Sequence, residues 1–365
     1  MMLEAARVAY YLEMAQTIGR SRPLYDVHVS PWEVLFGGLS YRPDPEHPGV
    51  YGLEGAVYKA PRAGPLRIEE ERESDQLSER PEVPSPLSRA VLRRQYAHVG
   101  PGVIADHMDL CGLSRCLLVP VVRRGADPAE QERLAFDLYA PDPRFALAFC
   151  PPPPGTAAEA MESIQAARAR HPIRAVKVNA NVQGLDLASP AGKASLAHLL
   201  SACRALSLPL VVHGGVSRLL EDPRGRSFAS LENLESFAWR AAAVPVVLCH
   251  AGLFGCPSAV VEALWPRLAR LLAQNDNVLV DLSGLSAATL RVVLERVDPG
   301  RIVFGSDALY FPPWSAVVRV LFTLEQLGLP VESTFAQLAG ANPERHLFGG
   351  ANPAQSVSDG SPHAH

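Results

Sequence analysis

The chain has 365 residues, of which 48% are apolar and 20% are charged, so it can bury a large core, and the disordered and fibrous classes are excluded. Its net charge of −4 and its pI near 6.3 lack the basic footprint that nucleic acids and anionic membranes require. No apolar run approaches the roughly 20 residues of a membrane span. We therefore expect a cytoplasmic protein with neither a nucleic-acid nor a membrane partner.

The first twenty residues contain Glu4 and Glu13 and no continuous apolar block, which predicts an amphipathic helix rather than a signal peptide. The chain also has six cysteines, none of them in a CxxC pair: Cys111, Cys116, Cys150, Cys203, Cys249 and Cys256. In a chain of this length such cysteines are expected to be reduced and mostly buried, not to form a disulfide framework.

Short apolar runs, rich in β-branched residues, recur along the chain. They span residues 24–30, 115–122, 144–150, 173–180, 208–215, 244–252, 277–284 and 301–309. Between the later runs lie helical patterns, at 157–170, 191–206 and 258–274. Apolar strands that alternate with helices predict parallel strands buried on both faces, and eight such units fit a (β/α)8 TIM barrel. A doubly wound open sheet is the alternative, which is weakened because no Gly-rich phosphate loop follows the first strand.

About 85 residues separate the first two predicted strands, far more than a βαβ unit requires. We expect one distorted TIM-barrel domain over 1–350, with an N-terminal helix and a cap-like insertion over 31–100. The segment "AVYKAPRAGPLRIEEE" within the insertion is compatible with a hairpin. Residues 351–365 are expected to be a disordered tail.

Polar residues at the carboxyl ends of barrel strands are where barrel enzymes carry out their chemistry. Four such residues follow separate predicted strands and should converge: His28, His213, His250 and Asp307. Imidazoles and a carboxylate suit Zn²⁺, and Mn²⁺ or Fe²⁺ nearly as well. Taken singly, each histidine is more often a satisfied core or surface residue, and Asp307 could simply cap the next helix. Their combination favours a site for one divalent ion.

The successive strand motifs resemble those of a known family. They read "YDVHVS", "RAVKVN", "VVHGG", "VLCHAG", "NVLVDLSG", "VFGSDAL" and "ANPERHLFG". In this order they are similar to the amidohydrolase-related (amidohydrolase-2) family, metal-dependent TIM-barrel enzymes that include hydrolases and decarboxylases. The resemblance runs from about residue 24 to 349 and omits the N-terminal helix, most of the insertion and the tail.

Carried over to this chain, the resemblance implies that His28, His213 and Asp307 are ligands of one divalent ion. Zn²⁺ is the expected ion, with Mn²⁺ and Fe²⁺ as alternatives. His250 and Asp307 are the implied acid/base residues, and Lys177 is implied to be a cation that lines the site, with carbamylation as the minority alternative.

Three further residues complete the predicted site. Asp26 is expected to hold His28 or the strand end through a hydrogen bond. Arg218 follows the fifth predicted strand and could pair with a substrate carboxylate, although a solvated loop is the plainer interpretation. Ser30 departs from the family, which has a second histidine there. The ion is then held with more water, or a neighbour such as Glu33 substitutes, or the site has lost its metal.

The resemblance implies a metal-dependent hydrolase that acts on an amide, ester or lactone of a small carboxylated metabolite through a metal-activated water. Non-oxidative decarboxylation of an aromatic or unsaturated carboxylic acid is the first alternative, because the same residues serve both reactions. A non-catalytic binding protein with a degraded metal site is the second alternative. The family also implies a homodimer.

Overall fold

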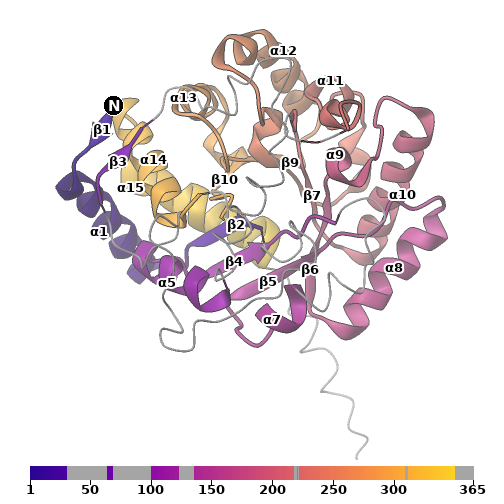
Figure 1. The fold of residues 1–365 in the computed structure, drawn as a ribbon, viewed down its shortest axis with the longest axis horizontal. Helices are drawn as coiled ribbons and strands as arrows, with labels where there is room; N and C mark the ends of the chain where they lie inside the picture. Colours follow the sequence, from indigo (N-terminus) through magenta and orange to yellow (C-terminus); the bar gives the residue numbers. More distant parts are fainter. Residues whose placement is uncertain are drawn as a thin grey trace, which may run out of the picture.

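The computed structural model describes residues 1–30, 64–68, 100–122, 135–217, 220, 222–308 and 311–349. Its centre is an eight-stranded parallel sheet surrounded by helices, as Figure 1 shows. The strands are β2 (Tyr25–Val29), β4 (Arg115–Leu118), β5 (Phe145–Phe149), β6 (Ile173–Val178), β7 (Leu210–Val212), β8 (Val246–Leu248), β9 (Val278–Asp281) and β10 (Ile302–Val303). Each lies inside one of the eight predicted runs, so the predicted strands are confirmed.

The sheet closes into a barrel between its first and last strands. The hydrogen-bonded order runs β10-β9-β8-β7-β6-β5-β4-β2, and all neighbouring pairs are parallel. A parallel bridge between Val29 and Ala308 then joins β2 to the segment after β10. Within this seam, the Ser30 amide donates to the Ala308 carbonyl at 2.9 Å, and the Asp307 amide donates to the His28 carbonyl at 3.0 Å. The closure confirms the TIM barrel and excludes the open doubly wound sheet.

Helices cover the outside of the barrel (Figure 1). The α-helices are α1 (Ala5–Ser21), α5 (Pro101–Cys111), α7 (Asp137–Tyr139), α8 (Ala157–Arg170), α9 (Ala180–Gln183), α10 (Pro190–Leu206), α11 (Leu231–Leu234), α12 (Ser258–Gln274), α13 (Ala287–Arg296), α14 (Pro313–Gln326) and α15 (Val331–Ala336). Short 3-10 or π segments are η2 (Gly225–Ser227), η3 (Trp239–Ala242), η4 (Cys249–Gly252), η5 (Pro299–Arg301), η6 (Gln337–Ala341) and η7 (Glu344–Phe348). The helical patterns at 157–170, 191–206 and 258–274 correspond to α8, α10 and α12.

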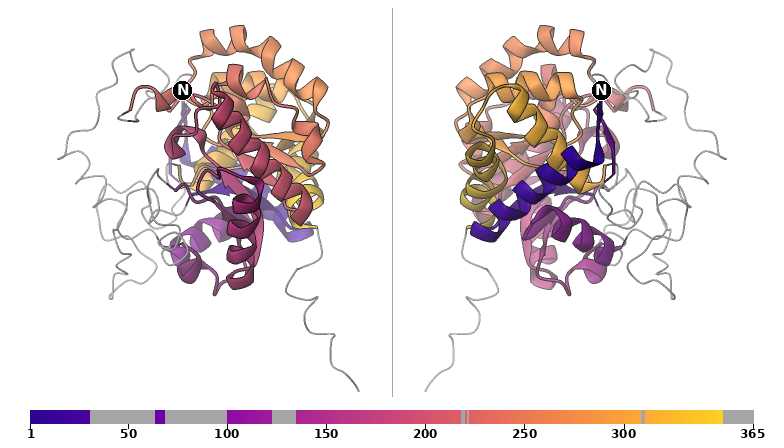
Figure 2. Two further views of the ribbon diagram at one scale, coloured as in Figure 1. Left: turned by 90° about the vertical axis from the view of Figure 1, so that its right-hand side faces the viewer. Right: turned by 90° about the vertical axis from the view of Figure 1, so that its left-hand side faces the viewer.

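The N-terminal helix α1 lies outside the barrel and packs on α14, α5 and α15, as the right-hand view of Figure 2 shows. Just before it, β1 (Met2–Leu3) pairs antiparallel with β3 (Leu66–Arg67). Residues 64–68, which include β3, are the part of the expected hairpin that the structure describes. The rest of that hairpin, most of the 31–100 insertion and the 351–365 tail lie outside the described residues. No helix among the described segments combines the length and the apolar character needed to cross a membrane.

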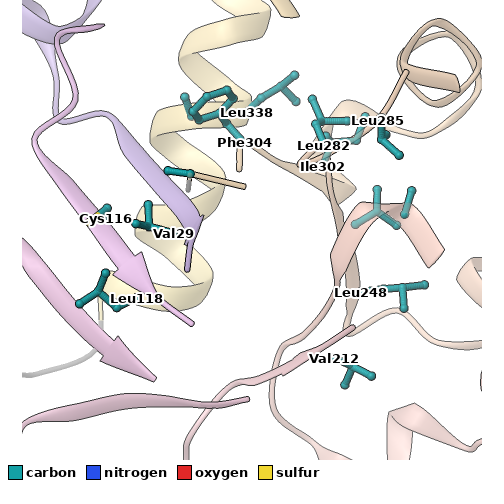
Figure 3. Close-up of a cluster of buried hydrophobic side chains, with 14 of the residues drawn as sticks. Val29, Cys116, Leu118, Val212, Leu248, Leu282, Leu285, Ile302, Phe304 and Leu338 are labelled. Carbon is teal, nitrogen blue, oxygen red and sulfur yellow. The ribbon is translucent and has the colours of Figure 1, made fainter. Parts of the chain in front are cut away.

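Successive side chains of a strand point to opposite faces of the sheet, so the apolar side chains form two layers. The outer layer lies between sheet and helices, and Figure 3 shows part of it, including Val212 and Leu248. The inner layer fills the barrel and includes Val211 and Val247. Phe348 belongs to the inner layer and stacks on Tyr25 of β2, with ring centroids 4.4 Å apart.

Candidate active site

Polar side chains replace the apolar inner layer where the strands end. His28 lies on β2, Lys177 on β6, His213 directly after β7, His250 in η4 after β8, and Asp307 after β10. All five are buried. Because the carboxyl ends of parallel barrel strands share one rim, these residues line the end of the barrel at which TIM-barrel chemistry takes place.

Asp281, the last residue of β9, is the centre of the hydrogen bonding at this rim. Its Oδ2 lies 2.9 Å from Nδ1 of His28. Its Oδ1 accepts from the His250 amide at 2.7 Å, from the Ser283 amide at 3.0 Å and from the Ser283 hydroxyl at 2.5 Å. One fully buried carboxylate therefore fixes residues from β2 and η4 together with its own loop.

The two nearest histidines are oriented through their Nδ1 atoms. His250 Nδ1 donates to the Ser283 carbonyl at 2.8 Å, and His28 Nδ1 donates to Asp281. In neither ring is Nε2 used by these bonds, and Nε2 of His28 lies 3.7 Å from Oδ1 of Asp307. A histidine held by a carboxylate at one nitrogen is the usual arrangement of an imidazole that binds a metal ion through the other.

His213 contacts this group of residues through its ring contact with His250. The two rings are 5.0 Å apart, and the His250 and His28 rings are 4.9 Å apart. Nε2 of His213 lies 3.3 Å from the Ser217 hydroxyl, which accepts from the Asn181 amide nitrogen at 2.9 Å. The half-buried Phe254 packs against both His213 and His250, so an aromatic ring forms one wall of the site.

Asp26 and Ser30 have different surroundings from those of His28. The β2–β4 register shifts between Asp26 and Val29, and Asp26 interacts with Cys111 and Cys116 of the outer layer. Oδ1 of Asp26 accepts from the His28 and Ser306 amides, at 3.1 and 2.9 Å, so it ties the strand ends together. Ser30 is buried beside the seam. Arg218 and Glu33 lie outside the described residues.

One group among the described residues could hold a metal ion: a nitrogen of His28, the sulfur of Cys249 and a carboxylate oxygen of Asp281 lie within 4.8 Å of one another. Nitrogen, thiolate and carboxylate donors fit Zn²⁺ and its first-row neighbours. Lys177 adds a buried ammonium, whose Nζ donates to Cys249 Sγ at 3.1 Å. The residues present therefore fit a divalent ion. Of this donor set, sequence analysis assigned a ligand role to His28 alone.

The backbone at the site adopts unusual conformations. His250, Ala251 and Asp307 have positive φ values of 56°, 52° and 60°, in the left-handed region that non-glycine residues rarely occupy. Such strain persists only where surrounding contacts enforce it, and it gathers at functional sites. Here the hydrogen bonds of Asp281 and the barrel seam supply those contacts.

Gly284 gives a prediction about the spacing of this site. It has φ +66°, and a Cβ there would lie 3.0 Å from both Oδ2 of Asp307 and Nδ1 of His250. Gly284→Ala should therefore displace both side chains and cost about 1–2 kcal/mol beyond the left-handed penalty. Gly328→Ala is the matched control, because Gly328 has the same φ and open space around it. Unfolding free energies are measured with urea. Equal values for the two variants would show that a Cβ at position 284 does not displace Asp307 and His250.

The electrostatics of His28 predict how the stability of the ion-free protein depends on pH. Burial opposes a charge on His28, but its interactions with Cys249 and Asp281 outweigh burial and raise its pKa to about 10. The unfolded imidazole has a pKa near 6.5, so His28 contributes its full stabilisation below pH 6.5 and loses it as the pH rises toward 10. Urea unfolding in a chelator should show a steeper loss between pH 6.5 and 9.5 for wild type than for His28→Asn. Parallel curves would contradict this.

The pKa values of His250 and His213 shift downward, opposite to that of His28. Burial lowers the pKa of His250 to about 4, although the Asp307 and Asp281 carboxylates oppose this shift. Burial also lowers the pKa of His213 well below its usual value, and Lys177 and His28 add to that effect. Both are therefore neutral at neutral pH, with lone pairs available to a proton or an ion. Burial also raises the pKa of Asp26 to about 6, against the hydrogen bonds that it accepts from Ser306 and His28.

Comparison with known proteins identifies the family and agrees with the fold. The profile of a family described as amidohydrolase matches residues 25–349, so the chain belongs to that family. No curated protein matches the chain. Among solved structures, similar folds include an amidohydrolase from Burkholderia multivorans with bound HEPES (18% identity, TM-score 0.53, covering 89% of this chain and 98% of that one). Others are the Metarhizium anisopliae IDCase (13%, 0.56, 90% and 97%) and a 2,6-dihydroxybenzoate decarboxylase complexed with 2,6-dihydroxybenzoate (13%, 0.53, 89% and 98%).

Proposed function

We propose that this protein is a metal-dependent hydrolase that acts on an amide, ester or lactone of a small carboxylated metabolite in the cytoplasm. The observation that carries the proposal is the orientation of His28. Asp281 holds its Nδ1, while its Nε2 faces Asp307 across 3.7 Å. This is the outer-shell support that metal-binding imidazoles usually have, in a chain of a family whose members typically require a metal.

In the proposal, His28, His213 and Asp307 hold one divalent ion, with Zn²⁺ expected and Mn²⁺ or Fe²⁺ as alternatives. Such an ion, when bound, lowers the pKa of water to about 7 and polarises a carbonyl. Because Nδ1 of His250 is committed to the Ser283 carbonyl, its Nε2 holds a lone pair, which would accept the proton of the attacking water and then give it to the leaving group. Asp307 is a second acceptor for that proton.

The substrate class is inferred from charge. Lys177 is a buried ammonium at the floor of the site, and besides its hydrogen bond to Cys249 it can donate to a substrate carboxylate. Arg218 stays a predicted second partner for that carboxylate. Phe254 offers an apolar wall to the remainder of a small substrate.

Decarboxylation of an aromatic or unsaturated carboxylic acid is the second candidate. Two observations favour it: the buried Lys177 ammonium, and a fold shared with a 2,6-dihydroxybenzoate decarboxylase. In that reaction His250 would again relay a proton: its Nε2 would accept one from water and give it to the carbon that loses CO₂. A binding protein without turnover is the third possibility to be tested.

Substrate panels separate these candidates. We expect the protein supplied with Zn²⁺ or Mn²⁺ to hydrolyse members of an ester, lactone and amide panel, and His250→Asn to lower the rate about 100-fold or more. The control is Asn233→Ala, remote from the site on α11. CO₂ release from carboxylated aromatics without any hydrolysis would reverse the ranking. No turnover in either panel by metal-loaded protein would favour the binding protein.

A further inference from the structure

Cys249 lies in the floor of the site, where no role has been assigned to it. It begins η4, directly after β8, and is fully buried. Its sulfur accepts a hydrogen bond from Lys177 and lies within 4.8 Å of a ring nitrogen of His28 and a carboxylate oxygen of Asp281. A buried thiol thus faces an ammonium, an imidazole and a carboxylate in the middle of an otherwise apolar layer.

The outer layer between sheet and helices contains four of the other five cysteines: Cys111, Cys116, Cys203 and Cys256. The fifth, Cys150, follows β5 and is also fully buried. Cys249 belongs to the inner layer, as does Val247, which lies two residues before it on β8. Alternation along β8 therefore directs Cys249 into the barrel, toward the end at which His28 and Asp281 meet.

We propose that Cys249 supplies a thiolate ligand to the divalent ion at His28, in the role of the imidazole that is missing at position 30. This inference rests on the proposed metal-dependent function. When the sulfur–metal bond forms, the thiol proton leaves to solvent and the sulfur keeps the electron pair that it shares with the ion. Ser30 itself offers a hydroxyl, which is a poor ligand for borderline-soft ions, whereas thiolate selects Zn²⁺ over harder ions such as Mn²⁺.

The charges around the sulfur are consistent with such an ion. Asp281, Asp307 and a Cys249 thiolate carry three negative charges against the one positive charge of Lys177, and a divalent ion would neutralise the remaining two. A metal-bound thiolate still accepts hydrogen bonds, so the bond from Lys177 to Cys249 can persist in the loaded site.

Cobalt gives a direct test, because Co²⁺ bound by a thiolate shows an intense near-ultraviolet charge-transfer band. Full-length protein is freed of metal with a chelator and titrated with CoCl₂, and Zn²⁺ affinity is measured by competition with a chromophoric chelator. We expect the band in wild type and in Cys203→Ala, a control in the outer layer. Cys249→Ser should lose the band and bind Zn²⁺ at least about tenfold more weakly.

The outcomes distinguish this inference from the function beneath it. Co²⁺ that binds wild type with its visible absorption but without the charge-transfer band would overturn the thiolate ligand and leave the metal-dependent function standing. Failure of wild type to bind either Co²⁺ or Zn²⁺ would overturn both. The wild-type spectrum decides the matter even if Cys249→Ser does not fold.

Discussion

Asp281→Asn is expected to destabilise the ion-free protein by about 3–5 kcal/mol and to abolish metal binding. The buried carboxylate accepts from His28, His250 and Ser283, and an amide can accept only at its oxygen. Burial alone would raise the pKa of Asp281, yet the charge and hydrogen bond of His28 hold it well below its usual range. The carboxylate therefore stabilises the fold above the unfolded pKa near 4, and this is lost only in stronger acid.

Chemical unfolding at pH 6 measures this effect, since the His28–Asp281 pair is fully charged at that pH. Asp298→Asn is the control, because Asp298 is an exposed carboxylate that accepts from the Gly300 amide at the start of η5. A loss for Asp281→Asn no larger than that of the control would show that Asp281 does not organise the site.

Asp307→Asn is expected to leave the fold nearly unchanged while lowering metal affinity about 100-fold and turnover about 1,000-fold. Asp307 has φ 60°, and asparagine tolerates this left-handed conformation as well as aspartate does. The backbone N–H of residue 307 would still donate to the His28 carbonyl and preserve the barrel seam. Only the negative charge that faces Nε2 of His28 is removed.

The two variants are expected to differ in stability and to share a loss of metal affinity. Metal titration and urea unfolding on the same samples should show both quantities reduced in Asp281→Asn but only metal affinity reduced in Asp307→Asn. Wild-type metal affinity in Asp307→Asn would exclude this carboxylate as a ligand. A comparable loss of stability in both variants would mean that Asp307, like Asp281, acts mainly in the fold.

The barrel was predictable because strands buried on both faces have nearly continuous apolar sequences. All eight apolar runs contain a strand. Closure was not visible in the pattern, since it depends on the bridge between Val29 and Ala308 and on a few hydrogen bonds between β2 and the segment after β10. Most of the 31–100 insertion lies outside the described residues, so its predicted role as a cap stays a prediction.

The candidate site was predictable where a polar residue interrupts the end of an apolar run, as His28 and Asp307 do. Asp281 stood in such a position within "VLVDLSG", but only the folded chain reveals how many partners its carboxylate accepts. Cys249 carried no signal, because cysteine in an apolar run reads as core. Asp26 was expected to hold His28 or the strand end, and its Oδ1 accepts from the His28 and Ser306 amides. The register shift on β2, which gives Asp26 different surroundings from those of His28, has no signal in the sequence.

Metal analysis of the purified chain shows whether a divalent ion binds at the end of the barrel. We expect about one equivalent of a divalent ion per chain, Zn²⁺ foremost, and a melting temperature that falls when a chelator removes it and recovers when it is restored. Protein that carries no metal, and whose melting temperature does not change when Zn²⁺ or Mn²⁺ is added, would contradict the account.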